Sequence, residues 1–198
     1  MATDGYLELR LGDFLDRLSA DGLAPGGGSA AALTVAFAAR LVAMVARCSV
    51  AWEEAAGVAA QANAIADRAV ELAQTDGTAW EAALTALRDA EAGIGEDDPK
   101  RSFTLERKLE VAAAAPLEIA SLGADAAALA ALAGEHGEPT YRADAAAAAA
   151  LAAGGAAAAR NLVRVNLGVR TSDPRLARAL ASEQAARDVA ARLLEAPR

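Results

Sequence analysis

Alanine tracts run through this sequence and limit the folds that it can adopt. The clearest tract, from Ala145 to Ala159, contains only alanine, leucine and glycine. Hydrophobic residues make up 55% of the chain but aromatic residues only 4%, and alanine supplies most of the apolar surface. Alanine is the best helix former and is depleted in strands, and no segment alternates β-branched residues with period two. The sequence therefore predicts an all-α fold.

Helical spacing and loop signals divide the chain into about seven mostly antiparallel helices. We predict them over residues 11–20, 29–50, 53–75, 79–90, 102–133, 141–169 and 174–195. Asp76-Gly77-Thr78 is predicted to be a junction, Pro116 to kink a helix, and Gly154-Gly155 to interrupt another. The helices at 29–50 and 141–169 are apolar almost all round, which is typical of central, buried helices. The length of 198 residues suits one hydrophobic core, so we predict a single domain over residues 1–198.

Charge and residue usage exclude several classes of protein. The formal net charge is -8 and no basic cluster occurs, which argues against nucleic-acid binding. Cys48 is the only cysteine and His136 the only histidine, so neither an internal disulfide nor a Cys-rich or His-rich metal site is possible within one chain. Residues 1–10 lack the apolar core of a signal peptide, and the apolar stretches 30–50 and 145–159 are interrupted by arginine or too short to span a bilayer. We predict a cytoplasmic protein without a membrane segment or a metal.

A glycine-rich segment, Pro25-Gly26-Gly27-Gly28-Ser29, precedes the first long apolar helix. The first N–H groups of a helix have no internal partners and carry partial positive charge. Glycines allow a ligand to approach these groups, so the segment suits an anion or an electron-rich oxygen. It equally suits a hinge capped by Ser29 that lets two helices pack closely. The residues alone leave both interpretations open.

A few polar residues stand out against the alanine background. Asp76 and Asp144 stand where each would either cap a helix or supply a carboxylate to a site. Asn161 and Asn166 are five residues apart, so their side chains point about 140° apart and cannot form one patch on one helix. A buried asparagine needs hydrogen-bond partners, which makes these two candidates for a specific role. Arg107 or Lys108 is a further candidate, at the start of the long helix ahead of Pro116.

Several motifs follow one another and cover nearly the whole chain. They are Phe14-Leu15, Pro25 to Ala32, Asp76 with Trp80, Ala112 to Leu117, Gly155-Ala156 and Asn161 to Leu167. In this order they resemble the cyclodeaminase/cyclohydrolase family, which includes the C-terminal domain of formiminotransferase-cyclodeaminase and the stand-alone methenyltetrahydrofolate cyclohydrolases. The chain departs from the family pattern where Glu138 replaces the Asn of a Gly-Asn pair, where Ala143 replaces the Ser of a Ser-Asp pair, and in the acidic linker 93–98. Trp80 by itself is interpreted as a core or interface residue.

The resemblance implies a folate one-carbon enzyme. Members of the family hydrolyse 5,10-methenyltetrahydrofolate to 10-formyltetrahydrofolate or cyclise 5-formiminotetrahydrofolate with loss of ammonia. By this resemblance, Asp76 or Asp144 stabilises the cationic one-carbon unit and accepts a proton, while Asn161 and Asn166 orient the pterin or a water. The other implied contacts come from the amides of Gly26, Gly27, Gly28 and Ser29, which would hold a folate carboxylate or carbonyl, and from Arg107 or Arg164, which would pair with the glutamate tail.

The resemblance also implies a homodimer with a tetrahydrofolate derivative as its substrate, and it calls for no metal or redox cofactor. The alternative is a non-catalytic helical module that binds folate or another protein and has lost turnover. The sequence leaves open which of the two reactions applies.

Overall fold

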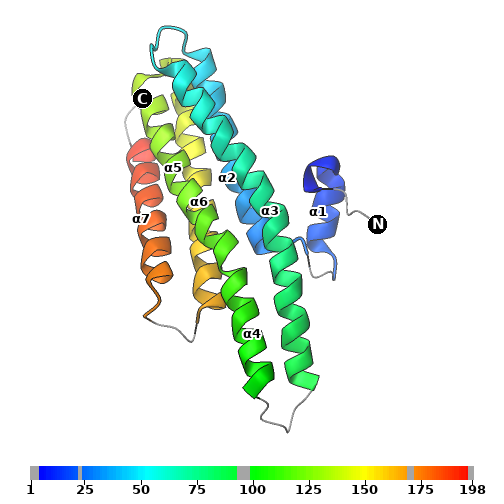
Figure 1. The fold of residues 1–198 in the computed structure, drawn as a ribbon. Helices are drawn as coiled ribbons and strands as arrows, with labels where there is room; N and C mark the ends of the chain where they lie inside the picture. The colour runs from blue at the N-terminus through cyan, green and yellow to red at the C-terminus, as the bar shows by residue number, and fades with distance from the viewer. Residues whose placement is uncertain (1–4, 22–23, 93–98, 169–171, 196–198) are drawn as a thin grey trace.

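The fold is known from a computed structural model, which describes residues 5–21, 24–92, 99–168 and 172–195. Every regular element in these residues is a helix, so the predicted all-α bundle is confirmed there. The α-helices are α1 (Leu11–Ser19), α2 (Gly27–Cys48), α3 (Ala55–Ala92), α4 (Pro99–Ala112), α5 (Ala114–His136), α6 (Arg142–Asn166) and α7 (Pro174–Glu195), and the short 3₁₀ helices are η1 (Tyr6–Glu8) and η2 (Pro139–Tyr141). Helices α2, α3, α5, α6 and α7 alternate in direction along the bundle, and α4 runs in line with α5 (Figure 1).

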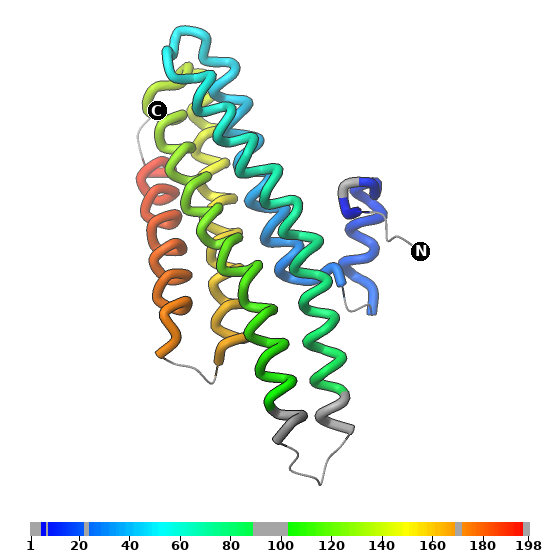
Figure 2. Tube along the Cα trace, in the orientation of Figure 1, coloured from blue at the N-terminus to red at the C-terminus, as the bar shows by residue number. Residues whose placement is uncertain are grey.

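Helices α2 and α6 occupy the centre of the bundle, as predicted. α2 packs against α3, α5 and α6, and α6 packs against α2, α5 and α7. α1 stands to one side of this bundle, beside α2 and α3 (Figure 2). Because alanine adds little bulk beyond the backbone, the long helices approach one another closely along most of their length.

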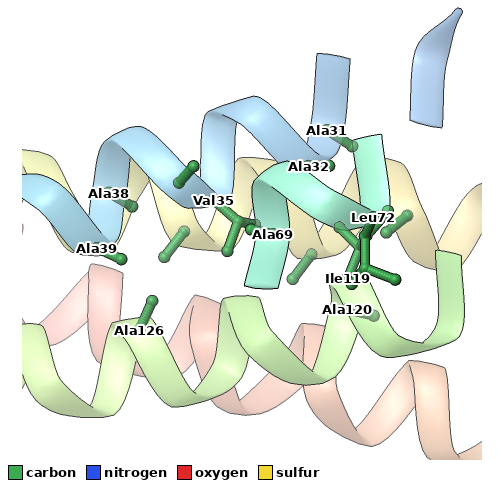
Figure 3. Packing of buried hydrophobic residues seen from close by; sticks show 14 of the residues in the cluster. Ala31, Ala32, Val35, Ala38, Ala39, Ala69, Leu72, Ile119, Ala120 and Ala126 are labelled. Carbon is green, nitrogen blue, oxygen red and sulfur yellow. The ribbon is translucent and has the colours of Figure 1, made fainter. Parts of the chain in front are cut away.

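The core is made mainly of alanine with a few larger side chains. Val35 of α2, Leu72 of α3 and Ile119 of α5 are fully buried among alanines from the same helices (Figure 3). Glycine tightens the packing further at Gly155 of α6, where a Cβ would lie 2.6 Å from Cγ2 of Val35 and 3.1 Å from the carbonyl oxygen of Ala31. The predicted interruption of α6 at Gly154-Gly155 is therefore wrong: the helix is continuous, and Gly155 serves helix packing.

The predicted junction at Asp76-Gly77-Thr78 is also wrong, because α3 runs unbroken from Ala55 to Ala92. Each of these turn-forming residues has a different use inside the helix. Thr78 donates its hydroxyl to the Gln74 carbonyl, 3.2 Å away in the same helix. A Cβ on Gly77 would lie 2.5 Å from the Tyr6 hydroxyl. The carboxylate of Asp76 lies against Gly28 of α2.

The predicted helix over residues 102–133 is present as two elements. α4 ends at Ala112 and α5 begins at Ala114, so the helix is interrupted one turn before Pro116. α5 also extends to His136, beyond the predicted end. Two predicted helices are thus joined into α3, and one is divided into α4 and α5.

Three helical segments of the described residues are long and apolar enough to cross a membrane, judged by length and composition only. They are Gly27–Cys48, Phe103–His136 and Pro139–Asn166, and 61%, 56% and 44% of the most apolar window of each is buried inside the bundle. Much of their apolar surface is thus used for packing between helices.

Candidate functional site

A pocket forms where α2 begins, because this helix starts against the side of α3. Ser29 in the first turn of α2 is fully buried and donates its hydroxyl to the Ala73 carbonyl of α3, at 2.8 Å. α3 continues past this contact to Ala92 and forms one wall. The pocket has a volume of about 160 Å³. Its lining residues come from α2, α3, α4 and α6 and from the residue before α2: Gly26, Gly27, Gly28, Asp76, Trp80, Ala112, Leu162, Val165 and Asn166.

Asp76 is the ionisable group of this pocket. Its side chain is on α3 and accepts a hydrogen bond from the backbone N–H of Ser29, in the first turn of α2. Asp76 thus caps a neighbouring helix through space, and not its own helix as one interpretation of the sequence had it. Only 8% of the residue is exposed. Burial raises the pKa of Asp76 to about 6, and the Ser29 N–H opposes this rise.

The glycines of the loop have distinct environments. A Cβ at Gly28 would overlap the carboxylate of Asp76, so a residue with a side chain at this position would displace the acid. Gly26 has open space around it, and Gly27 is exposed, with Leu162 4.0 Å from the position of a Cβ. Gly28 therefore allows α2 to pack closely against α3, whereas Gly26 and Gly27 leave their backbone groups accessible from the pocket.

Ser29 joins this site to the N-terminal segment. Besides donating to Ala73, its hydroxyl takes part in a hydrogen bond with the Tyr6 side chain. Burial raises the pKa of Tyr6, and hydrogen bonding to Ser29 opposes this rise. The contacts of Tyr6 with Ser29 and Gly77 hold η1 beside the start of α2.

Asn166 is the last residue of α6 and lies across the pocket from the start of α2. It is 9% exposed, and its Nδ2 donates to the Ala112 carbonyl at 3.0 Å. Asn161, in contrast, is exposed and accepts a hydrogen bond from Arg164 at 2.9 Å. The structure therefore places one asparagine in the pocket and the other outside it, in keeping with the predicted angle between them.

The two arginines predicted to bind a glutamate tail lie on the surface, outside the pocket. Arg107 is on α4, its side chain is 62% exposed, and it pairs with Glu110 at 3.2 Å. Arg164 lines a separate cavity of about 430 Å³ between α6 and α7, together with Arg160. Each arginine is within two turns of a pocket residue on its own helix.

Asp144 is not brought together with Asp76. It lies in the first turn of α6, while Asn166 is the last residue of the same helix. At 1.5 Å per residue these two residues are roughly 33 Å apart along the helix axis. Within one chain, Asp144 therefore cannot contact a ligand that is held at the start of α2, and the glycine loop is left with a single predicted acid.

Sequence reasoning did not assign Trp80, Leu162 and Val165 to the site. The signal was helical spacing, because Trp80 follows Asp76 by one turn and Leu162 precedes Asn166 by one turn. Ala112 contributes its backbone carbonyl, and the identity of its side chain gives no sign of this.

Other cavities lack these features. One of about 590 Å³ lies between α1 and the helices α2 and α3, and most of its lining is apolar. Its charged groups include Arg40 and Asp67, which pair with each other. In the described part of the chain, no group of three or more His, Cys, Asp or Glu side chains is placed to hold a metal ion.

Comparison with known proteins agrees with this architecture. A sequence model of the formiminotransferase-cyclodeaminase family matches residues 10–186. The chain belongs to this family. Its fold is similar to the crystal structure of formiminotetrahydrofolate cyclodeaminase from Thermotoga maritima, with a TM-score of 0.80 and 21% sequence identity over 96% of this chain and 97% of that chain. No curated protein matches the sequence. The resemblance drawn from the motifs is confirmed at the level of the formiminotransferase-cyclodeaminase family.

Proposed function

We propose that this protein is a folate one-carbon enzyme that cyclises 5-formiminotetrahydrofolate to 5,10-methenyltetrahydrofolate and releases ammonia. The observation that carries this proposal is the buried carboxyl of Asp76, which opens onto the pocket at the start of α2. Membership of the formiminotransferase-cyclodeaminase family supports the substrate class. The name of the similar Thermotoga maritima protein favours cyclisation over hydrolysis.

The reaction needs proton transfer more than strong nucleophilic activation. N10 of the folate attacks the formimino carbon, loses its proton, and forms the new C–N bond. The imino nitrogen takes up two protons in all and leaves as ammonia, and the methenyl product keeps a positive charge. A carboxyl whose pKa is about 6 is present in both protonation states near neutral pH, so Asp76 is suited to accept the first proton and return it. Its ionised form also stabilises the cationic product.

The size of the pocket indicates which part of the substrate it holds. A volume of about 160 Å³ is below the roughly 300–1,000 Å³ of sites that enclose a whole ligand. In our proposal the pocket holds the reacting end of the folate, with an electron-rich oxygen near the free N–H groups of Gly27 and Gly28. The rest of the molecule leaves past Val165, which is 57% exposed, towards the surface that carries Arg107 and Arg164.

The test is turnover by the purified protein, followed by the absorbance of 5,10-methenyltetrahydrofolate. This absorbance rises on cyclisation of 5-formiminotetrahydrofolate and falls on hydrolysis, so one signal measures both reactions. Asp76→Asn should lower kcat by about 100-fold or more, as expected for loss of a general acid–base group. The matched control is Asp144→Asn, which removes the same charge at the far end of α6 and should leave kcat within a factor of two.

Other outcomes would contradict the proposal. Equal losses in the two variants would remove Asp76 from its assigned role. Hydrolysis without cyclisation would assign the other reaction of the family. Binding without any turnover, seen as a rise in melting temperature with added folates, would favour the non-catalytic module. A homodimer is also part of the proposal, and a monomer in sedimentation experiments would overturn it.

A further inference from the structure

Pro116 interrupts the hydrogen bonding of the long helix beside the pocket. In an unbroken α-helix, the carbonyl of Ala112 would accept the N–H of residue 116. Proline has no N–H, so this carbonyl has no helical donor at that position. Helical bonds are present on either side of this position, with Ala113 N–H donating to Leu109 at 3.1 Å before it and Leu117 N–H donating to Ala113 at 3.2 Å after it. The carbonyl that lacks its helical donor thus belongs to Ala112, a residue that lines the pocket.

Asn166 takes the position of the missing donor. Its Nδ2 reaches the Ala112 carbonyl from the end of another helix, at 3.0 Å. Both residues are buried, where an unpaired carbonyl or amide costs free energy. The opposite orientation of the amide would place Oδ1 against the carbonyl oxygen, with no proton between two acceptors. The Ala112 carbonyl therefore fixes the orientation of the Asn166 side chain.

The fixed orientation determines what Asn166 offers to a ligand. Its Oδ1 accepts no hydrogen bond from any residue that the structure describes. Since Nδ2 is held by the Ala112 carbonyl, Oδ1 is the group that remains, and it can only accept. The pocket therefore combines acceptors, from Asn166 and Asp76, with the N–H donors at the start of α2.

We propose that Pro116 is a positioning residue of this site: it frees the Ala112 carbonyl to anchor Asn166, whose Oδ1 then accepts a hydrogen bond from an N–H group of the ligand. The ligand class rests on the proposed function, and a tetrahydropterin fits because it carries several N–H groups along one edge. Pro116 itself makes no contact with the ligand and acts through Asn166.

The first experiment tests the anchoring without any ligand or activity. In the Pro116→Ala variant, the backbone regains an N–H at position 116, which becomes available to the Ala112 carbonyl and competes with Asn166. Side-chain amide signals of ¹⁵N-labelled protein report this directly, with the exposed Asn161 as an internal reference. In the native protein we expect the Asn166 amide protons to exchange with water at least tenfold more slowly than those of Asn161, and to lose most of this protection in Pro116→Ala. Equal protection in the two proteins would overturn the proposal.

The second experiment tests whether the anchoring serves the ligand. Titration with 5,10-methenyltetrahydrofolate gives the Kd, and turnover of 5-formiminotetrahydrofolate gives KM and kcat. We expect Asn166→Ala to raise Kd and KM by about tenfold, the factor that corresponds to one hydrogen bond of about 1.4 kcal/mol. Pro116→Ala should raise both by a smaller factor and change kcat less than twofold. Asn63→Ala removes an asparagine of α3 that bonds to Arg40 outside the pocket, and it should change none of the three.

A double variant separates positioning from a general effect on folding. If Pro116 acts through Asn166, Pro116→Ala combined with Asn166→Ala should have the Kd of Asn166→Ala alone. Multiplicative losses, or a native Kd in Pro116→Ala despite a mobile Asn166 amide, would overturn the proposal. If the native protein neither binds nor converts these folates, the proposed function fails, while the exchange experiment still decides whether Pro116 positions Asn166.

Discussion

Replacement of Asp76 by asparagine would isolate the energetic cost of holding an acid at the start of α2. Asparagine has nearly the same size, and its side-chain oxygen can still accept the N–H of Ser29. The native and variant proteins therefore differ mainly in whether the group can ionise. Burial raises the pKa of Asp76 from 3.8 to about 6 in the folded protein.

The sign of the effect follows from this direction. Between pH 3.8 and about 6, the unfolded chain releases the Asp76 proton while the folded chain keeps it. The contribution to stability is therefore fully present below pH 3.8 and is lost as the pH rises through about 6. At about 1.4 kcal/mol for each pH unit between the two pKa values, the loss amounts to about 3 kcal/mol. Asparagine does not ionise, so Asp76→Asn should gain up to about 3 kcal/mol of unfolding free energy on the native protein between pH 4 and pH 8.

Thermal or urea denaturation of the two proteins at pH 4, 5, 6, 7 and 8 would measure this gain. For a chain of this length, about 3 kcal/mol corresponds to roughly 6–12 °C in melting temperature. The melting temperature of Asp76→Asn relative to the native protein should therefore rise by this amount between pH 4 and pH 8. Asp144→Asn, measured in the same series, corrects for the loss of one negative charge. A difference that stays constant from pH 4 to pH 8, or a native protein that gains on the variant as the pH rises, would refute the reasoning.

Two further predictions use pairs of glycines that differ in their surroundings. Gly28→Ala should displace the Asp76 carboxylate and lower kcat as strongly as Asp76→Asn. Gly26→Ala, which adds a methyl group in open space, should leave kcat within a few-fold of native. Similar losses in both variants would contradict the role assigned to Gly28. Gly155→Ala should destabilise the protein by about 1–3 kcal/mol, because the added methyl meets α2, whereas Gly154→Ala, in open space in the same helix, should stabilise it by up to about 1 kcal/mol. Chemical denaturation measures this second pair, and a stable Gly155→Ala protein would show that α2 and α6 are less closely packed.

The fold was largely predictable because alanine decides it. Residues such as Ala145 to Ala159 have few ways to form a core except by close packing of helices. The predicted helix boundaries were wrong at residues that usually mark turns. Asp76, Gly77 and Gly155 lie inside continuous helices, since each is used in a contact with another part of the chain. Local propensity cannot reveal such contacts, because the partner lies far away in the sequence.

The site was predictable only in part, for a similar reason. The order of the motifs places the glycine loop, Asp76 and Asn166 in one family pattern, but Asp144 belongs to the same pattern and lies at the other end of α6. The geometry of an antiparallel helix pair would have distinguished Asp76, which lies beside the glycine loop, from Asp144, which does not. Ser29 and Ala73 are almost equally far from the turn between α2 and α3, so an antiparallel pair of straight helices brings the loop beside Asp76.

The position of the pocket follows from where helices stop in an alanine-rich bundle. Such a core has few polar side chains, so backbone groups left unpaired by helix ends or breaks become a main source of polarity. Three of these interruptions meet here: the start of α2 at Gly27, the break after Ala112, and the end of α6 at Asn166. α3 passes all three without a break and adds Asp76 and Trp80 to the wall. A continuous helix beside a helix start, a helix break and a helix end thus brings donors, acceptors and an acid to the same cavity of a mostly apolar bundle.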